Sequence, residues 1–178
     1  MRITKLIVHC SATREGQHID VDTIRRWHVK GRGWNDIGYH YIIYLDGTIK
    51  KGREDNVQGA HTRGQNGNSL GICYVGGVEE DGKTPKDTRT CEQEESLESL
   101  LMTLKAIHTD SVVHGHRDFA NKACPSFDAT EEYEYISEIE YEIIVEWFGG
   151  SVVKDLLGGL DNLFTSKEEK IASLFRWP

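Results

Sequence analysis

Three side chains of the kind that bind transition metals stand at widely separated positions in the chain. His9 follows a short apolar run, His116 lies in a His-Gly-His sequence, and Cys124 comes eight residues later. Two imidazoles and one thiolate suit zinc, and three protein ligands leave a fourth position open for water or substrate. The spacing alone is weak support, because a chain with eight histidines supplies such a triplet by chance. A purely structural role for these side chains is equally compatible with the pattern.

Six short motifs include or surround these residues. In chain order they are residues 9–13 (HCSAT), 38–41 (GYHY), 46–48 (DGT), 68–72 (NSLGI), 75–77 (VGG) and 122–128 (KACPSFD). Together they resemble the zinc N-acetylmuramoyl-L-alanine amidases of the phage lysozyme type, which are relatives of the peptidoglycan recognition proteins. The resemblance covers residues 3–128. It implies an enzyme that cleaves the amide bond between N-acetylmuramic acid and the L-alanine of the peptidoglycan stem peptide.

The resemblance also implies roles for individual residues. His9, His116 and Cys124 would bind one zinc ion, and Tyr39 and Lys122 would be the catalytic residues. In such a site zinc polarises the amide carbonyl and lowers the pKa of a bound water. Lys122 would stabilise the oxyanion of the tetrahedral intermediate, and Tyr39 would orient the water or transfer its proton. Without the resemblance, Tyr39 would be interpreted as a core aromatic residue and Lys122 as an ordinary exposed lysine.

Two residues compete with the candidate ligands. His114 is the main rival of His116, since residues i and i+2 of a strand face the same way and both could approach a metal. The spacing to Cys124 favours His116, which leaves His114 a supporting or structural role. Cys10 adjoins His9 but is expected to point to the opposite face of its strand, as a core thiol.

Candidates for substrate binding lie in the glycine- and asparagine-rich loop that spans residues 59–69. His61 corresponds to a histidine near the substrate groove of the family. Arg63 and Asn68 suit carboxylates and amides of a peptide. Hydrogen bonds to the backbone and ordinary loop polarity explain the three residues nearly as well. The remaining histidines that the motifs leave out are expected on the surface; they are His18, His28 and His108.

The elements that must position these residues alternate between strands and helices. Strands are predicted over residues 3–9, 39–44, 70–75 and 111–116, with a hairpin turn at 45–48 and its return at 49–52. A helix capped by Asp20 or Asp22 should run to about residue 30, with Ile24 and Trp27 on its buried face. Leucines at helical spacing predict a second helix over residues 91–107. This order favours an α/β fold, with a mixed central β-sheet flanked by helices.

The acidic surplus of the chain lies almost entirely at its C-terminal end. The net charge is −8, of which residues 1–128 contribute −1 and residues 129–178 contribute −7. Apolar residues at helical spacing over that end predict short amphipathic helices. We therefore expect a zinc amidase catalytic domain over residues 1–130 and an acidic helical appendage over 131–178. The appendage could pack on the domain, mediate self-association or bind a protein partner; membrane binding is disfavoured by its negative charge.

Composition excludes several other classes of protein. The negative charge argues against nucleic acid as the main partner. There is no apolar run of about 20 residues that would span a membrane as a helix, and no Sec signal is recognised. We expect cytoplasmic synthesis with reduced thiols, followed by action on the cell wall after holin-type release or non-Sec export. A non-catalytic peptidoglycan-binding module is the alternative, and the presence of Tyr39, Lys122 and Cys124 argues against it.

Overall fold

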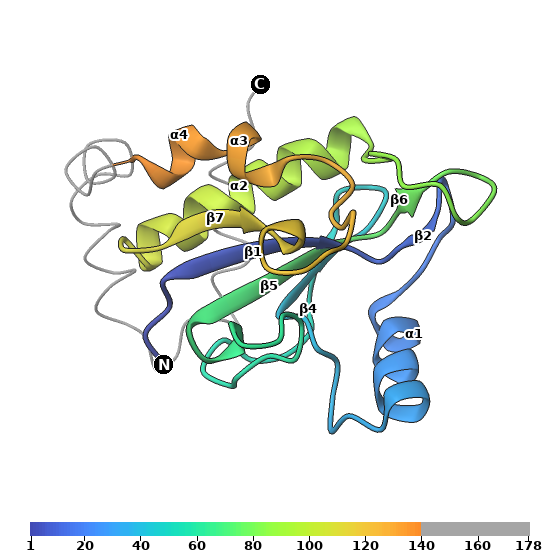
Figure 1. Cartoon of the computed structure of the whole chain (residues 1–178), viewed down its shortest axis with the longest axis horizontal. Coiled ribbons are helices and arrows are strands. Elements are labelled where there is room, and N and C mark those ends of the chain that lie inside the picture. Colours follow the sequence, from blue (N-terminus) through green and yellow to red (C-terminus); the bar gives the residue numbers. More distant parts are fainter. Residues whose placement is uncertain (140–178) are drawn as a thin grey trace.

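The chain folds around a five-stranded mixed sheet with the strand order β4-β3-β5-β1-β7. The computed structural model describes residues 1–139, and Figure 1 shows the arrangement of the elements. The sheet strands are β1 (Lys5–Cys10), β3 (Tyr41–Ile43), β4 (Ile49–Lys51), β5 (Ser69–Tyr74) and β7 (Val112–Gly115). All neighbours are parallel except the hairpin of β3 and β4. The expected mixed sheet with flanking helices is confirmed.

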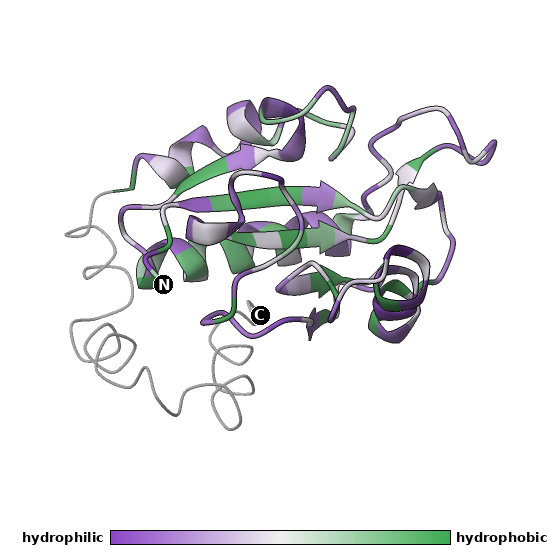
Figure 2. Cartoon of the chain, turned by 60° about the horizontal axis from the view of Figure 1, so that its bottom comes forward, coloured by the Kyte–Doolittle hydropathy of each residue, from purple (hydrophilic) through white to green (hydrophobic). Residues whose placement is uncertain are grey.

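The two central strands, β1 and β5, divide the molecule into two faces. Leu6 and Val8 of β1 pack with Leu70 and Ile72 of β5 in the main apolar cluster. Successive residues of a strand face opposite ways, so His9 points to the other face. Hydrophobic residues line the central strands and the helices that face them (Figure 2). The apolar alternation of β1 thus decides which face receives the first candidate ligand.

Helix α2 (Cys91–Ile107) covers the face of the main cluster. Its bounds agree with the helix predicted from the leucine spacing. Thr90 and Gln93 form a capping box that satisfies backbone N–H groups at its start. The side-chain amide of Gln93 also donates to the carbonyls of Ile43 and Val75, at 3.1 and 3.0 Å, which ties the start of the helix to β3 and to the residue after β5.

Helix α1 (Val21–Arg26) stands apart from α2 at the other side of the molecule (Figure 1). Its N-cap is Asp20, whose carboxylate accepts from the Thr23 N–H at 2.7 Å. The expected continuation to about residue 30 takes the form of a π-helical turn, η1 (Trp27–Gly31). Ile24 is buried as predicted, but the prediction for Trp27 is wrong, since this side chain is 42% exposed. The wider turn of η1 changes which side chains face the core.

Short elements complete the described chain. They are the paired strands β2 (Thr13–Arg14) and β6 (Gly77–Val78), the 3₁₀ turns η2 (Asn66–Asn68) and η3 (His116–Asp118), and the helices α3 (Ala129–Glu132) and α4 (Glu134–Ser137). Tyr133 and Ile136 of this last segment are buried in the main cluster. The predicted helices beyond residue 139 lie outside the described residues. Within residues 1–139, no helix combines the length and apolar character needed to cross a membrane.

Candidate active site

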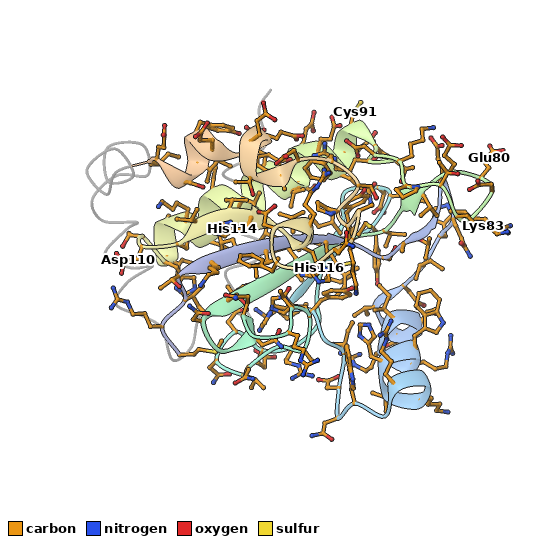
Figure 3. The ribbon with its side chains drawn as sticks, in the orientation of Figure 1. Glu80, Lys83, Cys91, Asp110, His114 and His116 are labelled. Atoms are coloured by element: carbon orange, nitrogen blue, oxygen red, sulfur yellow. The ribbon has the colours of Figure 1, made fainter. Side chains whose placement is uncertain are left out.

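The structure brings His9, His116 and Cys124 together at one edge of the sheet. One ligand atom from each of the three lies within 4.8 Å of the others. His9 is near the end of β1, and His116 directly follows β7, the parallel neighbour of β1. Because parallel strands end at the same edge, the topology alone places these two side chains near each other. Figure 3 shows His116 beyond the end of β7.

The orientation of His9 is set by contacts on both sides of its ring. Its Nδ1 lies 3.8 Å from Sγ of Cys124, whereas its Nε2 lies 3.1 Å from Nδ1 of His61. His61 Nε2 in turn lies 3.3 Å from Oγ of Ser69, whose hydroxyl donates to the Gln65 carbonyl. A proton on Nε2 of His9 and one on Nε2 of His61 satisfy this whole chain of contacts. Nδ1 of His9 then carries a free lone pair, which faces the cluster.

Burial keeps these two histidines neutral. Desolvation lowers the pKa of His9 well below its usual value, and electrostatic interactions with His61, His116 and Lys122 act in the same direction. Desolvation also lowers the pKa of His61 to about 3. The ring of His61 fits against β5 only because residue 71 is glycine: a Cβ there would lie 2.5 Å from Cγ of His61. A neutral imidazole is the form that binds a metal.

Cys124 is held by hydrogen bonds along the segment around it. The Arg117 N–H donates to the Cys124 carbonyl at 2.8 Å, and the Tyr74 hydroxyl donates to the Pro125 carbonyl at 2.6 Å. The backbone N–H of Cys10 donates to Sγ of Cys124 at 3.3 Å. A hydrogen bond with the Cys10 thiol and burial both raise the pKa of the Cys124 thiol, so its thiolate form requires a nearby cation.

Cys10 itself lies in the main apolar cluster and is 5% exposed, which confirms the prediction of a core thiol. All four cysteines of the chain are free thiols, as expected.

His114 is not part of the cluster of candidate ligands. Its Nδ1 lies 3.4 Å from Oδ2 of Asp118, and its ring contacts the ring of Phe119 at 5.1 Å between centroids. Both histidines were expected to be able to approach a metal because i and i+2 of a strand share a face. The strand ends at Gly115, however, so His116 belongs to the turn η3 and points elsewhere.

A cavity of about 510 Å³ opens beside the cluster. Its walls come from η1, from the loops before β3 and β5, and from the segment after β7. The lining residues are His28, Arg32, Trp34, Tyr39, Ala60, His61, Thr62, Arg63, Gly64, Asn66, His116, Phe119, Ala120 and Lys122. Three of them are cationic and none is acidic, so the cavity suits a ligand that carries carboxylates or carbonyl groups.

Tyr39 and Lys122 both line this cavity close to the candidate ligands. The ring centroid of Tyr39 lies 5.1 Å from that of His9. Burial raises the pKa of Tyr39 well above its usual value, so its hydroxyl stays protonated. Burial lowers the pKa of His116, and the nearby side chain of Lys122 lowers it further. The structure thus brings together all five residues to which the resemblance implies a metal-binding or catalytic role.

His28 is a lining residue that sequence reasoning missed. It was expected on the surface, but it is 7% exposed, and its Nδ1 accepts from the Gly38 N–H at 3.0 Å. Burial lowers its pKa to about 4, so the ring is neutral and its proton sits on Nε2. Its position four residues after the buried Ile24, on the same helical face, is the signal that could have indicated burial.

The three candidate substrate residues have different surroundings. His61 is buried behind His9, and Arg63 is an exposed side chain at the cavity wall. Asn68 is absent from the lining, and its amide group lies 2.8 Å from Oγ1 of Thr4. Asn66 lines the cavity instead, and its Oδ1 accepts from the backbone N–H groups of His61 and Thr62.

Comparisons with known proteins agree with this fold. The family model described as N-acetylmuramoyl-L-alanine amidase matches residues 1–127. The endolysin of Enterobacteria phage T3 is 48% identical over 129 residues, which cover 72% of this chain and 84% of that protein. The endolysin of Escherichia phage T7 is 46% identical with the same coverage.

Solved structures show the same fold. An endolysin amidase, LysCS, from Clostridium intestinale is 27% identical and superposes with a TM-score of 0.65, over 79% of this chain and 86% of that one. Drosophila PGRP-LB is 25% identical, with a TM-score of 0.62 over 78% and 82% of the two chains. The chain therefore belongs to the N-acetylmuramoyl-L-alanine amidase family and is similar to phage endolysins over most of their length.

Proposed function

We propose that this protein is a zinc-dependent peptidoglycan hydrolase of the endolysin type, which cleaves the amide bond between N-acetylmuramic acid and the L-alanine of the stem peptide. The observation that carries the proposal is the convergence of His9, His116 and Cys124 within 4.8 Å, beside a cavity that Tyr39 and Lys122 line. Family membership over residues 1–127 supports the same reaction.

The donor set fits a single zinc ion. Two imidazole nitrogens and one sulfur are a usual catalytic zinc environment, and three protein ligands leave one position open. The buried histidines are neutral, and the Cys124 thiolate needs a cation, so a divalent metal would satisfy the charge of the site. His61 would fix the ring of His9 from the side away from the metal, as outer hydrogen-bond partners of metal ligands do.

The catalytic roles follow from the protonation states of the side chains. When bound, zinc supplies a Lewis acid that polarises the scissile carbonyl and acidifies a water molecule. Lys122 lies at the cavity wall, where its side chain can stabilise the negative oxygen that develops on the carbonyl. Tyr39 keeps its phenolic proton, so its hydroxyl can donate a hydrogen bond that orients the attacking water or passes on a proton.

Substrate contact is assigned to the basic wall of the cavity. The guanidinium of Arg63 is exposed there and can bind a carboxylate of the stem peptide in two parallel hydrogen bonds. His28, whose Nδ1 is engaged by the Gly38 N–H, also lines this space. Asn68 acts on the substrate only indirectly, because its amide group contacts Thr4.

The place of action follows from the substrate. Peptidoglycan lies outside the cytoplasmic membrane, so the protein would reach it after holin-type release or by a non-Sec route. Self-association or a protein partner through residues 131–178 remains a separate proposal, which light scattering of the full-length protein tests. A monomer at all concentrations would rule out the self-association version.

The test of the proposed function is a digest of defined muropeptides, followed by mass spectrometry. The full-length protein is incubated with and without a chelator, and with zinc added back. Release of a free stem peptide that begins with L-alanine, only when zinc is present, is the expected result. Tight binding of the intact muropeptide without cleavage would instead indicate a recognition module.

A further inference from the structure

The outer edge of β7 is covered by hydroxyl groups from the two helices that follow the candidate site. Among residues 1–139, β7 is the last strand of the sheet and has β1 as its one strand neighbour. The Val113 N–H donates to Oγ of Ser137 in α4, at 3.0 Å. The Gly115 N–H donates to Oγ1 of Thr130 in α3, at 3.3 Å, and to Oδ2 of Asp118, at 3.1 Å. Edge N–H groups that a further strand would otherwise bind are thus satisfied by side chains.

Thr130 and Asp118 form one connected brace around the turn that carries His116. The Thr130 hydroxyl donates to Oδ2 of Asp118 at 2.5 Å, and the same carboxylate oxygen accepts from the Gly115 N–H. Gly115 directly precedes the turn η3, in which His116 is the first residue and Asp118 the last. The brace therefore holds both ends of the turn, and Thr130 anchors it to α3.

The same turn is packed against the segment that carries Cys124. A Cβ at position 115 would lie 3.1 Å from Cδ of Pro125, so the backbone of Gly115 is in close contact with this proline. The backbone N–H of Arg117 donates to the Cys124 carbonyl at 2.8 Å. A shift of Gly115 would consequently disturb His116 directly and Cys124 through these contacts.

We propose that Thr130 is a positioning residue for the metal centre, acting on His116 through Asp118 and Gly115. The inference rests on the proposed function, since it concerns the metal that His116 would bind. Thr130 lies beyond residues 1–127, which the family model matches, so the metal centre of this protein depends on α3 as well as on the matched region. Hydrogen-bond partners behind a metal ligand commonly alter metal affinity by about 10- to 100-fold.

The experiment compares three substitutions in the full-length protein. Thr130→Val removes the hydroxyl with little change of shape, and Thr130→Ser restores it. Ser137→Ala is the matched control, because it removes a hydroxyl that accepts from the same strand edge, two residues farther from the turn. The zinc dissociation constant is measured by competition with a chromophoric chelator. The visible spectrum of the Co²⁺-substituted protein reports the geometry of the metal site. Urea unfolding of the metal-free proteins reports stability separately.

We expect Thr130→Val to weaken zinc binding about tenfold or more and to shift the Co²⁺ spectrum. Thr130→Ser should keep the affinity and spectrum of the wild type. Ser137→Ala should lower stability while leaving zinc affinity and the Co²⁺ spectrum unchanged. In muropeptide assays, Thr130→Val should lower kcat with little change in KM, because the brace is not part of the cavity wall.

Wild-type zinc affinity and an unchanged Co²⁺ spectrum in Thr130→Val would overturn the inference, and so would equal losses of zinc in Thr130→Val and Ser137→Ala. If Thr130→Val does not fold, Asp118→Ala tests the same link, and unaltered zinc binding there would also overturn it. Failure of the wild-type protein to bind zinc would be a different result, which contradicts the proposed function itself.

Discussion

At the scale of single residues, the candidate site depends on protonation states that burial imposes. His9 and His61 are neutral because charging them in the interior is unfavourable. A hydrogen bond with the Cys10 thiol and burial both raise the pKa of the Cys124 thiol, which is therefore hard to ionise unless a cation is bound beside it. Lys122 differs from these groups because it is exposed at the cavity. The two predictions at this scale separate metal binding from catalysis.

Cys124→Ser should lose zinc and amidase activity together. A serine hydroxyl is not ionised at neutral pH and is a poor zinc ligand, so the site would keep only two imidazoles. Metal content measured by mass spectrometry and muropeptide hydrolysis are compared in the same preparation. Cys91→Ser, at an exposed position of α2, is the control and should keep both properties. One zinc per chain with normal turnover in Cys124→Ser would show that the ligand assignment is wrong.

Lys122→Ala should retain zinc but lose about 100-fold or more in kcat, as expected for the loss of a group that stabilises an oxyanion. The measurement is steady-state muropeptide hydrolysis, together with metal content. Lys83→Ala is a suitable control, since Lys83 lies in an outer loop away from His116 (Figure 3). Unchanged kinetics in Lys122→Ala would reduce this residue to an ordinary surface lysine.

At the scale of elements, one buried arginine connects the start of α2 with α3. The side chain of Arg89 is 3% exposed and pairs with the carboxylates of Asp87 and Glu132, at 2.7 Å each. Its guanidinium also lies 3.5 Å from the ring centroid of Phe127, three residues after Cys124. Arg89 therefore links the loop before α2, the segment after Cys124 and the helix that follows it.

Arg89→Ala should lower the free energy of unfolding by about 2 kcal/mol or more, because several charge-assisted hydrogen bonds and a ring contact disappear together. Urea denaturation of the full-length protein measures the change. Arg2→Ala provides a matched control: Arg2 pairs with Asp110 at the same 2.7 Å, but the two side chains are 80% and 59% exposed. That exposed pair should contribute less than about 1 kcal/mol. Equal effects of the two substitutions would contradict the prediction.

At the scale of the whole molecule, stability should depend on buried neutral histidines. Burial lowers the pKa of both His28 and His40 to about 4. His40 connects two segments, since its Nδ1 accepts from the Gly71 N–H at 2.9 Å and its Nε2 lies 3.1 Å from the Val57 carbonyl. Protonation would convert both Nδ1 acceptors into donors that face N–H groups. Each histidine therefore binds its proton more readily in the unfolded chain than in the folded one.

The contribution of these two histidines to the free energy of unfolding should accordingly be fully present above pH 6.5. It should decrease as the pH falls from 6.5 toward 4. Each histidine contributes a slope of at most about 1.4 kcal/mol per pH unit in this window. Urea unfolding at several pH values, in the presence of a chelator, measures the slope. His40→Gln should be less stable at pH 7 but less sensitive to acid. A wild-type stability that stays constant between pH 6.5 and 4.5 would be incompatible with these pKa values.

Much of the architecture was predictable because it depends on local pattern. The helix over residues 91–107 was located by its leucine spacing and by its capping residues, which are short-range signals. The positions of the main strands along the chain, and the hairpin, followed from apolar runs and turn residues. The set of His9, His116 and Cys124 could be proposed because the motifs that contain His9 and Cys124 occur in a characteristic order, and the spacing to Cys124 favoured His116 as the second imidazole.

Other features were decided only by the tertiary structure, because they depend on side-chain direction and on contacts between distant segments. His114 and His116 are equivalent in a strand pattern; the spacing to Cys124 favoured His116, and the end of β7 at Gly115 is what turns the two side chains in different directions. Trp27 is exposed, although it lies three residues after the buried Ile24, because η1 departs from the regular helix. Asn66 rather than Asn68 reaches the cavity, since η2 turns one amide inward and the other toward Thr4. The sequence by itself thus determined which chemical groups are present and in which elements, whereas packing across the sheet decided which of them meet.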